Sequence, residues 1–244
     1  MAITGNNVLV GASGGGRADV GDAPQTNLVW HFRADVGITE ATGVSAWLDQ
    51  VAETYSLTQA TSGNQPSYDA TETVGTLANA GAMTFDGSND VLESTDVKVA
   101  AVPHHIFVVW KPIGYTGGDK VITGASTAYQ TQIFAAGGDQ VYRIGAGAEG
   151  GDTTFTTGTW ALLVAVNNGA SSSLGKNADS PTGASITSRP WETEITLAAQ
   201  SPTAMAWGNH AVAELLIYDL VLTGATTSKL SEVENYINDQ YGLW

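Results

Sequence analysis

Short runs of β-branched and aromatic residues recur along most of this chain, and glycine, proline, asparagine or aspartate separates one run from the next. The run HIFVVWKP at residues 105–112 is almost continuously apolar, which predicts a strand covered on both faces. No helical period occurs within the runs, and the 29 glycines favour turns over long helices. The pattern predicts an all-β protein. The other predicted strands lie within residues 28–35, 44–50, 55–60, 82–87, 90–94, 120–124, 132–137, 140–147, 160–169, 194–199 and 212–219.

One helical pattern follows the strands, near the C-terminal end of the sequence. Thr227 or a neighbour can cap its start and Gly242 can end it. The spacing predicts one amphipathic helix that lies against a sheet or closes an end of a sandwich. The apolar side chains that share one helical face are Leu230, Val233, Tyr236, Ile237 and Tyr241.

The first 26 residues differ in composition from the remainder. NNVLVGA at residues 6–12 reads as one short strand, and a glycine-rich linker with Pro24 follows it. We therefore expect an extended N-terminal arm and linker over residues 1–26, and one domain over residues 27–244. The arm carries no basic start and no long apolar stretch, so no Sec signal is expected and assembly in a cytoplasm is predicted.

The charge balance excludes several classes of partner. Lys and Arg number 9 against 24 Asp and Glu, a net charge of −15, which repels phosphate backbones and anionic lipid headgroups. Nucleic acid and membranes are therefore not expected, whereas neutral glycans, cations and other proteins are compatible with this charge. The absence of cysteine excludes disulfides, zinc–thiolate sites and thiol nucleophiles.

Six segments in a fixed order resemble a known family. They are LVWHFRADVGITEATGVSAWLDQ, YSLTQATSGNQPSY, MTFDGSNDVLES, IFVVWKP, GTWALLVAVNNG and AELLIYDLVLT with VENYINDQYG. Together they resemble laminin G-like domains of the concanavalin A-like jelly-roll superfamily, in its bacterial and phage branch. The resemblance implies an antiparallel jelly-roll β-sandwich with a C-terminal helix. It implies no single function, because members include sugar-binding modules, adhesion modules, glycan hydrolases and spacers.

MTFDGSNDVLES, at residues 83–94, has aspartates that suit either a calcium loop or a tight turn. An EF-hand loop that began at Asp86 would need glutamate where Val97 stands. The simpler interpretation is a hairpin turn in which Asp86 accepts backbone N–H groups. No cofactor is therefore predicted. Asp86 and Asp90 remain weak calcium candidates, to which Asp119 or Asp139 could add oxygens.

The sequence shows no convincing catalytic group. Glycan hydrolases of this superfamily carry alternating carboxylates on one strand, and the nearest match, Glu192 with Glu194, lacks a third acid between or beside them. Glu214 and Asp219 are an odd number of residues apart, which places them on opposite faces of a regular strand. The adjacent His104 and His105 point apart for the same reason. We therefore predict that the chain is not an enzyme.

Aromatic residues in loop-rich segments are the remaining candidates for a binding site. Sugar sites present Trp or Tyr faces beside polar side chains, although such residues also line protein interfaces and cover sandwich ends. Trp30, Trp47 and Trp160 match positions that are core or near-core in the relatives. The predicted glycan-binding residues are Trp191, Trp207, Tyr115 and Tyr129.

The arm and the resemblance together predict a non-enzymatic virion protein, most simply a phage capsid decoration or head-fibre protein that displays a lectin-like sandwich. A strand-bearing arm suits attachment to a neighbouring subunit by strand addition. The expected partners are other virion proteins bound through the arm, further copies of the chain, and host or environmental glycans. The alternatives are a tail fibre or receptor-binding subunit, a bacterial adhesin lectin module, and, less favoured, a glycoside hydrolase.

Overall fold

A computed structural model describes most of the predicted domain. The described residues are 23–51, 53, 55–94, 103–114, 118–124, 132–135, 141–145, 149–185, 195–199, 206–222 and 229–244. The predicted arm lies outside them except for residues 23–26, so its role stays a prediction.

The first sheet contains eight strands, and every pairing between them is antiparallel. Its strands are β1 (Leu28–Arg33), β5 (Ser67–Asp69), β6 (Ala82–Asp86), β8 (His104–Pro112), β13 (Ala161–Asn167), β14 (Ser172–Lys176), β15 (Thr182–Ala184) and β17 (Asn209–Tyr218). Their order is β15-β14-β13-β8-β17-β6-β5, and β1 also pairs with β17.

The second sheet contains nine strands and is also antiparallel. Its strands are β2 (Ile38–Glu40), β3 (Val44–Leu48), β4 (Ser56–Thr58), β7 (Leu92–Ser94), β9 (Lys120–Gly124), β10 (Gln132–Ala135), β11 (Val141–Gly145), β12 (Glu149–Thr154) and β16 (Ile195–Leu197). The order is β12-β11-β10-β9-β16-β7-β4-β3-β2. Two short 3-10 helices, η1 (Ser62–Asn64) and η2 (Gly169–Ser171), lie between strands. The predicted all-β sandwich is confirmed.

Strand β8 shows how the two layers are held together. Ile106, Val108 and Trp110 lie in the core between the sheets, with Trp30 of β1 and Trp47 of β3. The alternate residues Phe107 and Val109 belong to a second buried cluster on the other side of the first sheet. The period of two therefore divides this strand between two cores, as its continuous apolar run predicts.

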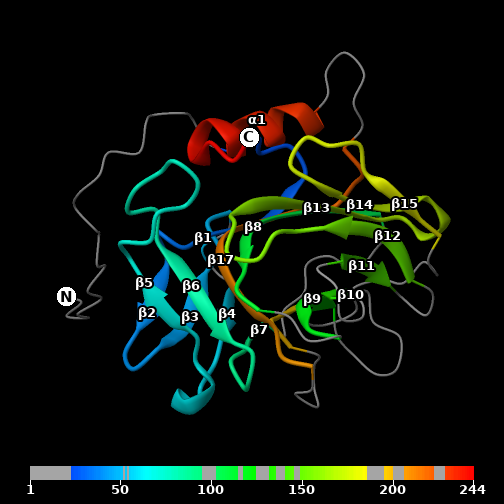
Figure 1. Cartoon of the computed structure of the whole chain (residues 1–244). Helices are drawn as coiled ribbons and strands as arrows, with labels where there is room; N and C mark the ends of the chain where they lie inside the picture. Colours follow the sequence, from blue (N-terminus) through cyan, green and yellow to red (C-terminus); the bar gives the residue numbers. More distant parts are fainter. Residues whose placement is uncertain are drawn as a thin grey trace.

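The second cluster is closed by the helix α1 (Lys229–Tyr241), which lies over the outer face of the first sheet, the face turned away from the second sheet (Figure 1). The predicted apolar face is confirmed: Val233, Tyr236, Ile237 and Tyr241 are all buried there. Gly242 ends the helix at φ +57°, a left-handed conformation that glycine adopts without strain. In the part of the chain that the structure describes, no helix has the length and apolar character needed to cross a membrane.

Candidate functional site

The predicted glycan-binding aromatics lie mostly outside the described residues. This is the case for Trp191, Tyr115 and Tyr129, whereas Trp207 is described and partly exposed. Trp207 stands just before β17, where Asn209 pairs with Asp86, so it shares one end of the sandwich with the β6–β7 turn. The grouping of these four aromatics stays a prediction.

The β6–β7 turn uses its carboxylates for its own backbone. Asp86 Oδ1 accepts hydrogen bonds from the backbone N–H groups of Ser88 at 2.7 Å and Asn89 at 3.2 Å. Asp90 Oδ2 accepts one from the backbone N–H of Asp86 at 3.0 Å. This is the hairpin arrangement that the sequence favours over a calcium loop. Among the described residues no group of three or more His, Cys, Asp or Glu side chains is placed to hold a metal ion.

Asp90 is the more buried of these two carboxyl groups. Burial raises the pKa of Asp90 to about 6, the hydrogen bond from the Asp86 backbone opposes that rise, and the Asp86 charge adds to it. Asp90 therefore takes up a proton far more readily than an ordinary aspartate.

The acid pair considered in the sequence, Glu192 and Glu194, lies outside the described residues, so its placement stays untested. Glu214 is fully buried and serves the fold. Its Oε1 lies 2.6 Å from His31 Nε2 and accepts a hydrogen bond from Tyr236 Oη at 3.0 Å, and its Oε2 accepts one from Tyr241 Oη at 2.6 Å. We call these four residues the Glu214 cluster.

A β-bulge places Glu214 in this position. The pairing of β17 with β8 sets Val212 opposite Trp110 and Glu214 opposite Val109, so Ala213 is an extra residue. The bulge turns Glu214 to the outer face, beneath α1, where both tyrosine hydroxyls reach it. The bulge precedes Glu214, and the pairing is regular from Glu214 to Tyr218, so it does not affect the period-two argument for Glu214 and Asp219.

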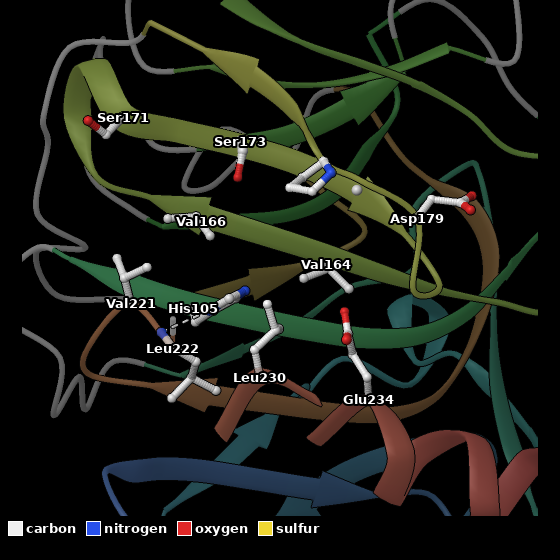
Figure 2. Close-up of a pocket in the computed structure, with 12 residues that line it drawn as sticks. His105, Val164, Val166, Ser171, Ser173, Asp179, Val221, Leu222, Leu230 and Glu234 are labelled. Carbon is white, nitrogen blue, oxygen red and sulfur yellow. Dashed lines mark hydrogen bonds between the residues drawn. The ribbon is translucent and has the colours of Figure 1, made fainter. Parts of the chain in front are cut away.

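A pocket of about 200 Å³ opens between the outer face of the first sheet and α1 (Figure 2). Its walls come from β8, β13, β14, the turn after β14, the segment after β17, and α1. The lining residues are His105, Val164, Val166, Ser171, Ser173, Gly175, Asp179, Pro181, Val221, Leu222, Leu230 and Glu234.

Strand alternation and side-chain size make this space. On β14, Leu174 faces the core between the sheets, so Ser173 and Gly175 face outward into the pocket. These two are small, whereas Val164 and Val166 on the neighbouring β13 supply an apolar floor. The helix contributes Leu230 to the opposite wall without filling the gap.

His105 is the buried polar group of the pocket. It is 1% exposed, and its ring stacks on Phe107 with centroids 4.6 Å apart. Its Nδ1 accepts a hydrogen bond from the backbone N–H of Leu222 at 3.2 Å. Burial lowers the pKa of His105 to about 3, so the ring is neutral at physiological pH. Because Nδ1 accepts, the single ring proton resides on Nε2.

That Nε2–H group has no hydrogen-bond partner among the described residues, although it is buried. Figure 2 shows one ring nitrogen at the dashed line to Leu222 and the other on the opposite side of the ring. An unpaired buried donor costs roughly 1–3 kcal/mol. Protein atoms cover Nε2 itself, so a group from a ligand in the pocket would relieve that cost only after those atoms shift.

Two carboxylates complete the polar lining. Glu234 is half-buried on α1 and extends toward the strands, and Asp179 is exposed in the turn after β14 (Figure 2). Neither carboxylate has a side-chain hydrogen bond or an ion pair among the described residues. Burial raises the pKa of Glu234 above its usual range. The pocket therefore offers a neutral imidazole, the hydroxyls of Ser171 and Ser173 and two carboxylates around an apolar floor.

Sequence reasoning missed this pocket. His105 was considered only with His104, and the prediction that the two point apart is consistent with His105 alone lining the pocket. Asp179 lies in a turn and Glu234 on the polar part of a helix, where acidic residues are ordinary. No strand was predicted over residues 172–176, so the small outward-facing residues Ser173 and Gly175 of β14 gave no signal of space on that face.

No protein-family model matches the sequence, and no curated protein sequence is similar to it. Solved structures are similar in fold. Trypanosoma rangeli sialidase, bound to a difluoro-nononic acid, matches 88% of this chain and 33% of its own with a TM-score of 0.63 and 11% identity. Domain 4 of AbnA, an extracellular GH43 arabinanase from Geobacillus stearothermophilus, in complex with arabinotriose, matches 86% of this chain and 98% of its own, with a TM-score of 0.54 and 17% identity.

A third similar structure is botulinum neurotoxin type C, described as entering cells through interaction with two ganglioside molecules. It matches 88% of this chain and 52% of its own, with a TM-score of 0.51 and 10% identity. This chain spans about a third of the sialidases that it matches. At these identities the likeness shows a shared all-β sandwich fold alone. None of these three structures is described as a phage protein or a laminin G-like domain, so that branch stays a prediction.

The prediction that the chain is not an enzyme is contradicted by these comparisons. The similar solved structures are mainly enzymes, the sialidases and the arabinanase. The prediction relied on the lack of paired acids at alternate positions of one strand. Asp179 and Glu234, the two carboxylates that line the pocket, come from a turn and a helix, so strand spacing does not detect them.

Proposed function

We propose that this chain is a carbohydrate-binding β-sandwich domain and that the pocket between α1 and the first sheet receives a sugar residue. The observation that carries the proposal is the pocket itself, in which two carboxylates and two serine hydroxyls surround an apolar floor beside the buried Nε2–H of His105. Groups of this kind are normally paired in proteins, and a ligand is one source of the pair.

A sugar matches the remaining groups of the pocket. One hydroxyl or ring oxygen accepts from His105 Nε2–H, and other hydroxyls donate to Glu234 and Asp179. The C–H face of the ring lies against Val164 and Val166. The cavity of about 200 Å³ is smaller than the roughly 300–1,000 Å³ of pockets for drug-sized ligands, so we expect a single sugar ring to enter.

The fold comparisons support the same class of ligand. The arabinanase domain is similar over almost its whole length and is described in complex with arabinotriose. The neurotoxin is described through its interaction with gangliosides. Both are glycan ligands of proteins that contain this sandwich, so glycan binding is consistent with the fold as well as with the pocket.

A glycan array followed by titration calorimetry tests the proposal. We expect micromolar to millimolar binding of a glycan terminus, and Ser173→Tyr should abolish it by filling the pocket. Ser67→Tyr is the matched control, because Ser67 is exposed on β5 at the opposite edge of the same sheet. Binding that survives Ser173→Tyr, or no binding to any glycan, contradicts the proposal.

Glycoside hydrolysis is the second candidate function, and two observations favour it. Glycosidases use a pair of carboxylates on either side of the scissile bond, and Asp179 and Glu234 line one pocket. Burial raises the pKa of Glu234, as general acids require. Release of reducing ends from the bound glycan, lost in Glu234→Gln, would establish hydrolysis.

The carrier of the domain is a separate prediction. The arm over residues 1–26 and the family resemblance favour a virion, with attachment to other virion proteins and to further copies of the chain. Glycan binding at the pocket suits a tail fibre, an adhesin or a displayed capsid protein equally. Deletion of residues 1–22 should abolish incorporation into particles and leave glycan binding unchanged.

A further inference from the structure

We infer that the pocket selects sugars by charge: it accepts a terminal sugar without a carboxylate and rejects sialic and uronic acids, with Glu234 as the specificity-determining residue. The inference rests on the proposed function and names the class of sugar that this site takes.

The charges around the pocket are of one sign. The charged side chains that line it, Asp179 and Glu234, are both acidic. Recognition of a carboxylate normally uses Arg or Lys, and neither type is among the lining residues. A sugar carboxylate in this space would face like charges, and none of the described lining side chains is a compensating cation.

On the strands that line the pocket, the basic residue closest in sequence to a lining residue has its side chain directed away from the pocket. Lys176 follows Gly175 on β14, and its ammonium lies 5.7 Å from the centroid of the Phe155 ring, which belongs to the core between the sheets. Strand alternation therefore directs Lys176 away from the pocket that Gly175 lines. The side chain of Asn177 is also bound outside the pocket, since its Oδ1 accepts a hydrogen bond from the backbone N–H of Leu162 at 2.9 Å.

His105 does not supply the missing cation. Protonation of its Nδ1 would break the hydrogen bond from Leu222 and would place a charge in a site that is 1% exposed. The ring therefore acts as a neutral donor. A neutral donor suits a hydroxyl or ring oxygen, and it compensates a carboxylate only weakly compared with a guanidinium.

Half-burial makes Glu234 the more effective of the two carboxylates. Asp179 is exposed and its charge is screened by water and salt, whereas Glu234 lies against the apolar floor, where electrostatic interactions are stronger. Its carboxylate accepts hydroxyl hydrogens from a neutral sugar and repels an anionic one. The same group therefore contributes to both binding and rejection.

The test compares matched neutral and acidic ligands by calorimetry: lactose against sialyllactose, and galacto-oligosaccharides against galacturono-oligosaccharides. We expect the acidic member of each pair to bind at least about tenfold more weakly. Glu234→Gln should reduce the difference in affinity between the two ligands to a few-fold, because the acidic ligand is no longer repelled and binds more tightly. The amide oxygen still accepts hydroxyl hydrogens, so much of the affinity for the neutral ligand is retained.

Glu232→Gln is the matched control, because Glu232 is exposed on the same helix and does not line the pocket. It removes one negative charge of the same −15 net charge, and it should leave the affinity difference between acidic and neutral ligands unchanged. Equal effects of Glu232→Gln and Glu234→Gln would assign the rejection to the overall charge and overturn the inference. Equal binding of neutral and acidic ligands would also overturn it, while binding of both kinds would leave the proposed function intact.

Discussion

The Glu214 cluster and the pocket both lie between the first sheet and α1, and they use the same chemical groups in opposite ways. In the cluster, one buried glutamate is contacted by His31, Tyr236 and Tyr241 within 3.0 Å. In the pocket, His105 keeps a buried N–H without a partner among the described residues. The Glu234 carboxylate lines the same pocket and has no side-chain hydrogen bond to a described residue. The first arrangement is closed, and the second is incomplete.

The difference teaches how to separate a structural polar group from a binding group. A buried carboxylate or imidazole alone identifies neither, because folds and sites both contain them. Satisfied hydrogen bonds indicate a role in the fold, since removing one partner leaves the others buried and unpaired. Unsatisfied groups beside a cavity are candidates for ligand binding, and the cavity is what distinguishes His105 from buried groups such as Trp30 Nε1 and His210 Nε2, which also lack a partner among the described residues.

The largest expected effect tests the closed arrangement. Glu214→Leu should lower the free energy of unfolding by about 3–5 kcal/mol, because it leaves two tyrosine hydroxyls and His31 without their acceptor. Urea unfolding followed by fluorescence measures the change. A loss below about 1 kcal/mol would contradict the structural role of the cluster. Glycan affinity per folded molecule should stay unchanged, which separates the cluster from the pocket.

Asp90 sharpens the comparison, because it is a buried carboxyl with a single backbone donor and belongs to neither region. Its pKa is raised from 3.8 to about 6 in the folded chain, so folding favours the protonated form. This contribution to stability is present below pH 3.8 and is lost as the pH rises to about 6.

Relative to Asp90→Asn, the wild type should therefore lose on the order of 2 kcal/mol of unfolding free energy between pH 4 and 7. The asparagine still accepts from Asp86 N–H, and the other carboxyl groups are common to both proteins. Parallel urea titrations over this pH range give the difference. A constant difference would show that Asp90 titrates normally.

His105→Phe should lower glycan affinity roughly tenfold, about 1.4 kcal/mol, by removing the Nε2–H donor. Stability should change by less than about 1 kcal/mol, because loss of the Leu222 contact is offset by removal of an unpaired buried donor. Calorimetry and urea unfolding on the same preparation measure both values. A stability loss as large as that of Glu214→Leu would place His105 with the structural groups.

The smallest effect is expected at the β6–β7 turn. Asp86→Ala should cost about 1 kcal/mol, because two turn N–H groups lose their acceptor but remain exposed to water. The cost should be equal in calcium and in EDTA if the carboxylate serves only the turn. A loss that appears only in calcium would indicate an ion at Asp86 and Asp90.

Much of the sandwich was predictable because its signals are local. The split of β8 between two cores follows from a run in which every residue is apolar or aromatic between His105 and Trp110. The helix face from Val233 to Tyr241 follows from i, i+3, i+4 spacing, and its stop follows from Gly242. The β6–β7 turn was recognisable because Asp86 bonds to residues two and three positions later.

The candidate site was not predictable in the same way. His105, Ser173 and Glu234 are separated by more than fifty residues from one another, and each alone is an ordinary residue for its element. The bulge at Ala213, which turns Glu214 toward α1, has no glycine or proline to mark it. The candidate aromatics, by contrast, were chosen from loop context, and three of the four lie outside the described residues.

The sequence by itself determined that this chain forms two apolar-faced sheets with one helix and a hairpin, because periodicity and turn chemistry act between near neighbours. Only the tertiary structure decided which polar groups are paired, because pairing depends on side chains that meet across strands and helix. Glu214 contacts three side chains through hydrogen bonds and stabilises the fold. His105 and Glu234 line a cavity instead. That difference is the basis for proposing that a sugar binds in the cavity.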